Sequence, residues 1–181
     1  MKNKKIYSYP KSANANSDAE ICASVGEFLR EFSDTAPVGF SVIRDKNGKP
    51  YIVGIDGIYV SVAHDKELCL VVVSQSEIGI DLERAERRVK NPLALAGRYF
   101  CEDEVAFLGD SPTDAAFADM WVRKEALSKL IGRGVPCMKE KSVFSSDIRM
   151  EKIEDIDGYI VYTAEYSEKT DNKQKGVYNY E

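Results

Sequence analysis

The chain has 181 residues, of which 44% are apolar and 30% are charged, and its formal net charge is −5. This composition is that of an ordinary globular protein, long enough for one domain or for two small packed halves with a real core. Residues 1–49 hold eight Lys and Arg against six Asp and Glu, a balance of +2 that leaves −7 for the rest. A general nucleic-acid-binding protein needs a broad basic face, so that class is not expected.

Neither a signal peptide nor a membrane contact is expected. No apolar run follows the basic residues 1–11, and no stretch is long and apolar enough to span a bilayer. The cysteines are scattered without C-x-x-C spacing, at Cys22, Cys69, Cys101 and Cys137. We therefore expect free thiols in a reducing, cytoplasmic compartment.

The first part of the chain predicts one amphipathic helix. Apolar residues from Ile21 to Phe32 recur at helical spacing. Ser17 stands three residues before Glu20, which is the spacing of an N-terminal capping box. We therefore expect a helix over residues 18–32.

Short strands surround this helix in the sequence. Alternating or continuous apolar patterns predict strands over residues 6–9, 38–43, 51–55, 58–62, 68–73 and 78–83. Asn47-Gly48 predicts a turn, and Asp56-Gly57 predicts a tight hairpin between the third and fourth of these strands. The run 68–73 is apolar throughout, which is typical of a central buried strand. We expect a meander that ends at the edge strand 78–83.

After residue 83 the pattern becomes mainly helical. Helical spacing and helix-start residues predict helices over residues 91–100, 102–109 and 114–131. Gly132 supplies a C-terminal stop for the long helix. Further strands are expected at residues 143–144 and 159–166, before a polar tail from residue 169.

Two acidic residues, Asp81 and Glu83, alternate with apolar residues in the strand 78–83. Successive strand side chains point to opposite faces, so both carboxylates project from one face. Carboxylates this close repel unless a cation lies between them, and paired oxygen ligands suit Mg²⁺. The plain alternative is a strand with one solvated face.

Three charged residues of the long helix are also candidates. Glu125 and Lys129 are one turn apart at the edge of its apolar stripe, where they could reach into a cleft or form a surface ion pair. Lys124 falls near the middle of the stripe, where the alternative is a stem lying on apolar surface with its ammonium at the water.

The two segments together resemble a known signature. Gly79-Ile80-Asp81-Leu82-Glu83 matches G-I-D-x-E, and Trp121-Val122-Arg123-Lys124-Glu125-Ala126-Leu127-Ser128-Lys129 matches W-x-x-K-E-A-x-x-K of the 4′-phosphopantetheinyl transferases. The resemblance is to the longer, two-halved type. It implies an α+β fold in which two similar halves, residues 1–83 and 84–181, pack their antiparallel sheets about a pseudo-twofold axis. It also implies a monomer with its site where the halves meet.

The resemblance implies roles for single residues. The implied metal ligands for Mg²⁺ are Asp81, Glu83 and Glu125. The implied catalytic residues are Glu125, as the base, and Lys129 and Lys124, as charges beside phosphate. The implied coenzyme A-binding residues are Lys49 (in a G-K-P block), His64 and Lys129.

Some positions near these residues depart from the family pattern or leave two interpretations open. Ala63 and Asp65 flank His64 where the family has Ser and Ser or Thr, and a carboxylate beside a phosphate is unfavourable unless it points away or is paired. Arg44 and Lys46 are candidates for the coenzyme A 3′-phosphate by charge alone. Glu104 is either near the metal site or an ordinary first-turn helix carboxylate.

The implied activity is Mg²⁺-dependent transfer of 4′-phosphopantetheine from coenzyme A to a serine of an apo acyl or peptidyl carrier protein. The alternatives are another Mg²⁺-dependent phosphoryl-transfer enzyme and a non-catalytic protein that binds coenzyme A or the carrier. A basic cluster that follows the acidic strand could meet an acidic carrier, or its arginines could pair with Glu86 and Glu102; the cluster is Arg84, Arg87, Arg88 and Lys90.

Overall fold

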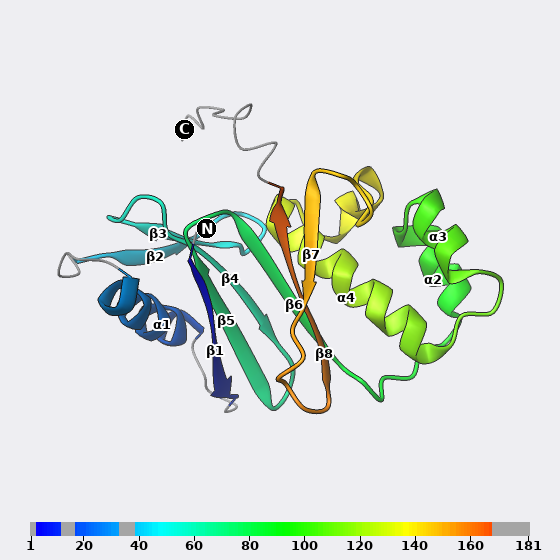
Figure 1. The fold of residues 1–181 in the computed structure, drawn as a ribbon, viewed down its shortest axis with the longest axis horizontal. Coiled ribbons are helices and arrows are strands. Elements are labelled where there is room, and N and C mark those ends of the chain that lie inside the picture. Colours follow the sequence, from blue (N-terminus) through cyan, green and yellow to red (C-terminus); the bar gives the residue numbers. More distant parts are fainter. Residues whose placement is uncertain (1–2, 12–16, 33–38, 168–181) are drawn as a thin grey trace.

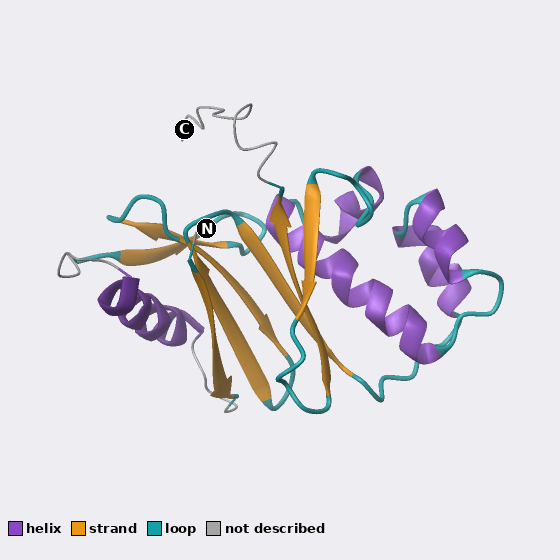
Figure 2. Cartoon of the chain, in the orientation of Figure 1, coloured by secondary structure: helices purple, strands orange, loops and turns teal. Residues whose placement is uncertain are grey.

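The computed structural model describes residues 3–11, 17–32 and 39–167; the expected tail from residue 169 and the start of the strand expected at residue 38 lie outside them. The helices are α1 (Ser17–Phe32), α2 (Pro92–Tyr99), α3 (Glu102–Leu108), α4 (Asp114–Ile131) and the 3₁₀ helix η1 (Val135–Glu140). The strands are β1 (Lys4–Pro10), β2 (Ser41–Arg44), β3 (Pro50–Val53), β4 (Tyr59–His64), β5 (Leu68–Ser74), β6 (Ile78–Arg84), β7 (Ile148–Lys152) and β8 (Tyr159–Tyr166). The predicted α+β class is confirmed, with antiparallel strand pairs throughout the described ranges (Figures 1 and 2).

Two three-stranded sheets share one strand order. In the first, β5 lies between β1 and β4, and in the second, β8 lies between β6 and β7. In sequence order, β1 and β6 are the first strands of their sheets, and they pair with the last ones, β5 and β8. The strands before the last, β4 and β7, pair with the other edges of β5 and β8. β2 and β3 form a separate hairpin. The repeated order is that of two similar sheets, and β6, which the expected division after residue 83 places in the first half, belongs to the second sheet. The division into halves and a twofold axis between them stay predictions.

β5 is buried on both faces, which confirms the prediction from its apolar run. Val71 and Val73 pack in a cluster with Phe28 of α1, whereas Leu70 and Val72 pack in a second cluster with β6 and β8. This second cluster joins the two sheets. α1 therefore lies at one end of the molecule, and α4, α2 and α3 lie at the other (Figure 1).

The long helix α4 has the predicted bounds. The Thr113 hydroxyl accepts a hydrogen bond from the Ala116 amide (3.1 Å), and Gly132 ends the helix in the left-handed region at φ 76°. α4 packs against β6 and β8, with Phe117 and Leu127 in its buried cluster. The helix thus places its C-terminal half beside the strand that carries Asp81.

The predicted hairpin at Asp56-Gly57 and the predicted meander are wrong. β3 pairs with β2 through the turn at Asn47-Gly48, and β4 pairs with β5 instead. Gly54 takes a φ of 101° and its backbone closely approaches Gly39, so β3 ends before the expected turn. β6 is not a strand of the first sheet; it is an edge strand of the second sheet and pairs with β8.

The predicted strand at Val143-Phe144 is also wrong. The Val143 amide donates to the Glu104 carboxylate (2.7 Å) rather than to a neighbouring strand, and the strand of this region, β7, follows it. The strand predicted over residues 159–166 is confirmed as β8. In the part of the chain that the structure describes, none of the helices is long and apolar enough to cross a membrane.

Candidate functional site

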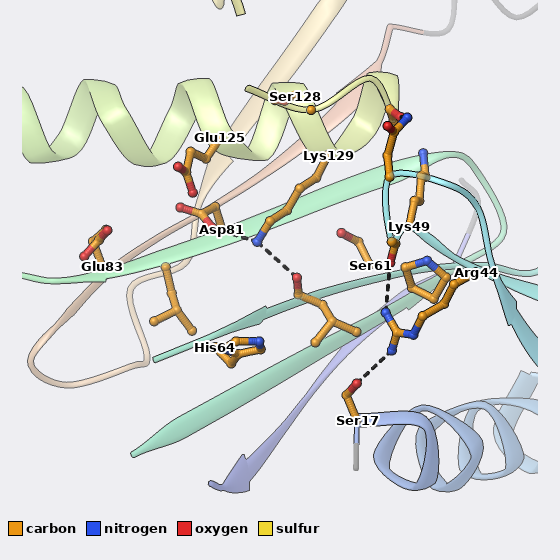
Figure 3. Close-up of a pocket in the computed structure, with 17 residues that line it drawn as sticks. Ser17, Arg44, Lys49, Ser61, His64, Asp81, Glu83, Glu125, Ser128 and Lys129 are labelled. Carbon is orange, nitrogen blue, oxygen red and sulfur yellow. Dashed lines mark hydrogen bonds and ion pairs between the residues drawn. The ribbon is translucent and has the colours of Figure 1, made fainter. Parts of the chain in front are cut away.

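One pocket collects most of the predicted site residues. Its volume is about 420 Å³, and its wall comes from the start of α1, the β2–β3 hairpin, β4, β6 and the C-terminal end of α4. Elements from both sides of residue 83 therefore form it. The predicted residues in its wall are Lys49, His64, Asp81, Glu83, Glu125 and Lys129 (Figure 3).

A glycine lets α4 approach β6 closely at this pocket. A Cβ atom on Gly79 would lie 2.0 Å from the Ala126 carbonyl oxygen and 2.5 Å from the Leu130 amide nitrogen, distances that no side chain could adopt. The helix backbone thus lies directly on the strand. Glu125 and Lys129 directly precede the two contact residues of α4, Ala126 and Leu130, and both side chains lie beside Asp81, two residues after Gly79 on β6.

Lys129 joins three elements at the centre of the pocket. Its ammonium donates to Asp81 Oδ1 (2.7 Å) on β6 and to the Val62 carbonyl (3.0 Å) on β4. Asp81 is 4% exposed, and its buried Oδ2 has no hydrogen-bond donor among the described residues while the neighbouring Glu125 is ionised. A buried carboxylate oxygen without a donor is costly, so this atom is suited to a ligand that carries positive charge.

The pKa values of both neighbouring carboxyl groups are raised. Burial raises the pKa of Asp81, although the Lys129 ammonium opposes this. Burial, together with the Asp81 charge, raises the pKa of Glu125 to about 7, against the opposing charges of Lys129 and Arg87. Glu125 is therefore a carboxyl group that can take up and release a proton near neutral pH.

Comparison with known proteins identifies the family. The family model of the 4′-phosphopantetheinyl transferase superfamily matches residues 77–173, more than half of the chain. The chain belongs to this superfamily. Over 92 residues it is 33% identical to the 4′-phosphopantetheinyl transferase psf-1 of Bacillus pumilus. This alignment covers 49% of this chain and 38% of that protein. Over 95 residues the chain is 28% identical to the 4′-phosphopantetheinyl transferase gsp of Aneurinibacillus migulanus, covering 51% and 38% respectively. The alignments thus span well under half of these curated relatives.

The superfamily's acidic residues fit a metal ion in part. In residues 3–11, 17–32 and 39–167, no group of three or more His, Cys, Asp or Glu side chains is arranged to hold a metal. Glu83, whose carboxylate is ion-paired with Arg87, lies apart from Asp81 and Glu125 (Figure 3). Asp81 and Glu125 do suit a hard cation, because they offer oxygen atoms, one of them buried and without a donor.

Lys49 and His64 line the pocket at different places. The Lys49 ammonium donates to the Leu130 carbonyl at the end of α4 (2.7 Å), and burial lowers its pKa. His64 ends β4, and burial, followed by the charges of Lys11 and Lys129, lowers its pKa. Both residues lie N-terminal to the region that the superfamily model matches, so the fold, and not that match, places them in the pocket wall.

Two basic residues near the pocket carry no strong signal in the sequence. Lys11 Nζ donates to His64 Nδ1 (2.7 Å), a contact between β4 and the segment after β1 that only the fold creates. Arg44, a candidate by charge alone, lines the pocket and donates to Asp18 Oδ1 (2.6 Å) and to Ser17 Oγ (2.7 Å). Lys46, the other such candidate, is not among the residues of its wall.

Asp65 points away from the pocket. Its carboxylate accepts from the amides of Glu67 (2.7 Å) and Leu68 (2.8 Å), from Arg84 Nε (2.9 Å) and from the Tyr159 hydroxyl (2.9 Å). Burial opposes ionisation, but these hydrogen bonds outweigh it and lower the pKa of Asp65 to about 2. The expected conflict between Asp65 and a phosphate beside His64 does not arise.

Lys124 and Glu104 do not reach the pocket. Their side chains are both 0% exposed and form an ion pair in which Lys124 Nζ lies 2.7 Å from Glu104 Oε2. The ammonium also donates to the Lys141 carbonyl (2.6 Å), and Glu104 accepts from the Cys101 amide (2.7 Å) in a capping box of α3. The alternative interpretation of Lys124, with its ammonium at the water, is wrong. A contact between Lys124 and a phosphate is therefore not part of our proposal.

Two of the four residues of the basic cluster form ion pairs within the described part of the chain. Arg84 pairs with Asp65 (2.9 Å) and Glu67 (2.7 Å), and Arg87 pairs with Glu83, so the pairs expected with Glu86 and Glu102 are replaced by others. The side chains of Arg88 and Lys90 are exposed.

Proposed function

We propose that this protein transfers the 4′-phosphopantetheine group from coenzyme A to a serine of an apo acyl or peptidyl carrier protein. The observation that supports this most strongly is the convergence of Asp81, Glu125 and Lys129 in one pocket. These residues come from the two motifs of the superfamily, which are distant in sequence and meet through the packing of α4 on β6.

The reaction needs an in-line displacement at phosphorus. The serine oxygen forms a bond to the pantetheine-side phosphorus of the coenzyme A pyrophosphate, and the bond from that phosphorus to the bridging oxygen breaks. The electron pair leaves with 3′,5′-adenosine diphosphate. The serine proton passes to Glu125, whose carboxylate lies beside Asp81 in the pocket. Lys129 supplies fixed positive charge beside the phosphate.

A divalent cation completes the charge balance in this proposal. Asp81, Glu125 and Glu83 would hold Mg²⁺, which would neutralise negative charge on the pyrophosphate oxygens. Glu83 must exchange its contact with Arg87 for the cation, because the ion pair now holds it. Without a cation, Lys129 is the positive charge on Asp81.

Coenzyme A would lie along the basic wall of the pocket. We propose that Lys49, His64 and Lys129 contact its phosphates. Arg44, already a candidate by charge, lines the same pocket, and Lys11, beside His64, is a further candidate. The wall includes elements of residues 1–83 and of residues 84–181, in keeping with two α+β halves that share one site. We expect a cytoplasmic monomer that acts without nucleic acid or membrane.

Mass spectrometry of apo carrier proteins tests the proposal. The carriers are incubated with the protein, MgCl₂ and coenzyme A, and we expect the added mass of one phosphopantetheine. Chelation of Mg²⁺ and the variant Asp81→Asn should each abolish the addition. A rise in Tm with coenzyme A but no mass change on any carrier would favour a non-catalytic binding protein. A rise in Tm with inorganic pyrophosphate but not with coenzyme A would favour a different phosphoryl-transfer enzyme.

A further inference from the structure

The third acidic residue of the pocket, Glu83, is held by an arginine that follows it closely in the chain. The Arg87 amide donates to the Arg84 carbonyl (3.1 Å), and this turn brings the Arg87 guanidinium back onto the Glu83 carboxylate. The side chains of Glu83 and Arg87 are 25% and 37% exposed, so the pair is partly shielded from water. Such a pair is stronger than one at a fully exposed surface.

Arg87 has a rigid support on its other side. Its guanidinium lies over the ring of Trp121, 5.8 Å from the ring centroid. Trp121 in turn stacks with Phe117 (5.9 Å) and meets Tyr99 edge to face (5.6 Å), which fixes the indole in the core of α2 and α4. The tryptophan of the W-x-x-K-E-A-x-x-K motif therefore supports the arginine that binds Glu83.

The ion pair separates Glu83 from the other two carboxylates. Asp81 and Glu125 lie together beside Lys129, whereas Glu83 lies apart in Figure 3, and the described residues contain no three-ligand group. We propose that Arg87 is a positioning residue that holds Glu83 away from Asp81 and Glu125, so that a divalent cation must displace Arg87 before Glu83 can bind it. This rests on the metal site of the proposed function and adds the residue that sets its affinity.

Substitution of Arg87 tests this inference through cation binding. The measured quantity is the half-maximal MgCl₂ concentration, at which half of the protein has bound the cation in isothermal titration calorimetry without coenzyme A or carrier. A rise in Tm would not give it, because that rise grows with the logarithm of the cation concentration. Arg87→Met removes the competing charge and frees Glu83, so we expect a half-maximal concentration about tenfold lower than that of the parent. Arg87→Gln should behave in the same way, which guards against a folding defect of one variant. Arg87→Lys keeps the charge and should restore a value near the parent's.

Arg84→Met is the matched control. Arg84 also pairs with carboxylates, Asp65 and Glu67, and also lies over an aromatic ring, that of Tyr159 at 5.5 Å from the centroid. The substitution removes one positive charge, as Arg87→Met does, but Arg84 pairs with no carboxylate of the pocket wall. The half-maximal MgCl₂ concentration of Arg84→Met should therefore equal that of the parent. Asp81→Asn should lose the Mg²⁺ response, which assigns the response to this site.

The outcomes separate this inference from the proposed function. Equal or weaker Mg²⁺ binding by Arg87→Met, or equal tightening by Arg84→Met, would overturn the role of Arg87. The same preparations are assayed for phosphopantetheine transfer by mass spectrometry. Transfer by the parent with no tightening in Arg87→Met would remove the inference alone. Tightening without transfer to any carrier would remove the proposed function and leave the inference standing.

Discussion

Two adjacent residues of α4, Lys124 and Glu125, lie in different surroundings. Lys124 points into the core and pairs with Glu104, whereas Glu125 points into the pocket beside Asp81. Consecutive helical residues are rotated by about 100°, so neighbours in the sequence face different surroundings. The buried pair of Lys124 and Glu104 is fully hydrogen-bonded, which offsets the cost of removing two charges from water. Residue identity alone therefore does not separate a structural lysine from a site lysine.

The raised pKa of Glu125 predicts that Mg²⁺ binding depends on pH. The pKa lies at about 7 instead of 4.5, so below pH 7 the group holds a proton that a cation must displace. The half-maximal MgCl₂ concentration should rise about tenfold for each pH unit below 7 and level off above it. Isothermal titration calorimetry with MgCl₂, at pH values from about 5.5 to about 8, measures this, because most domains stay folded in that range.

Glu125→Gln provides the comparison for this prediction. The amide cannot bind or release a proton in this range, so the variant should bind Mg²⁺ weakly and with little dependence on pH. An unchanged slope in Glu125→Gln would assign the proton to another group of the pocket.

The contact between α4 and β6 is the element-scale feature on which the site depends. Gly79 allows the backbone of the helix to lie on the strand, and Asp81 follows on the same strand. The period of the helix then brings Glu125 and Lys129, which are one turn apart, to the same carboxylate. One close approach therefore positions three charged side chains.

Gly79→Ala should separate these elements. The added Cβ would meet backbone atoms of Ala126 and Leu130, which cannot move without shifting α4. We expect a loss of about 3 kcal/mol or more in the free energy of unfolding, and weaker Mg²⁺ binding in the protein that remains folded. Urea unfolding followed by circular dichroism measures the first quantity, and the Mg²⁺-dependent rise in Tm measures the second.

Gly97→Ala is the control for this substitution. Gly97 lies in α2, its added Cβ would meet nothing within 4 Å, and alanine favours a helix over glycine. Its stability should equal or slightly exceed that of the parent. A Gly79→Ala protein as stable as Gly97→Ala would show that α4 does not need this close contact.

At the scale of the whole molecule, the pocket wall includes Glu83, near the end of β6, and the segment that joins β6 to α2 follows directly after this strand. Arg84, the last residue of β6, and Arg87, in the segment after it, are ion-paired within the chain, whereas Arg88 and Lys90 of that segment are exposed. An acidic carrier protein that docked there would bring its serine close to Glu83 and Asp81. We therefore propose Arg88 and Lys90, rather than the whole basic cluster, as the carrier-binding residues.

Charge reversal tests this docking face. Arg88→Glu with Lys90→Glu should lower kcat/KM for an acidic carrier at low salt by about tenfold or more, because opposite charges mainly speed association. The loss should shrink as salt rises, since exposed charges are screened within about 10 Å at 0.1 M. The KM for coenzyme A should stay unchanged. Steady-state kinetics at low and high NaCl measure these values.

Arg30→Glu serves as the control for charge itself. Arg30 is exposed on α1, at the opposite end of the molecule from α2 (Figure 1). It should leave kcat/KM for the carrier close to that of the parent. Equal losses from Arg30→Glu and from the double variant would mean that net charge, not the segment after β6, governs carrier binding.

Much of the fold could be predicted from the sequence because it depends on local pattern. Apolar periodicity predicted α1, α4, the buried strand β5 and the strand β8, and Gly132 predicted the end of α4. The motif around Asp81 and the motif around Glu125 together predicted the superfamily, which the family model confirms. These features depend on side-chain type and spacing within one segment.

The tertiary structure alone decided which segments and charges meet. Asp56-Gly57 has the sequence of a hairpin turn, yet strand pairing is a competition among all edges of the chain, and β3 pairs with β2. Arg87 reaches Glu83, and Lys11 reaches His64, because turns and sheet register bring them together. The sequence by itself determined the chemical groups and the elements that carry them. Only packing over long range decided which lysine enters the pocket, because burial and partner distance, not residue type, fix the energy of a charge.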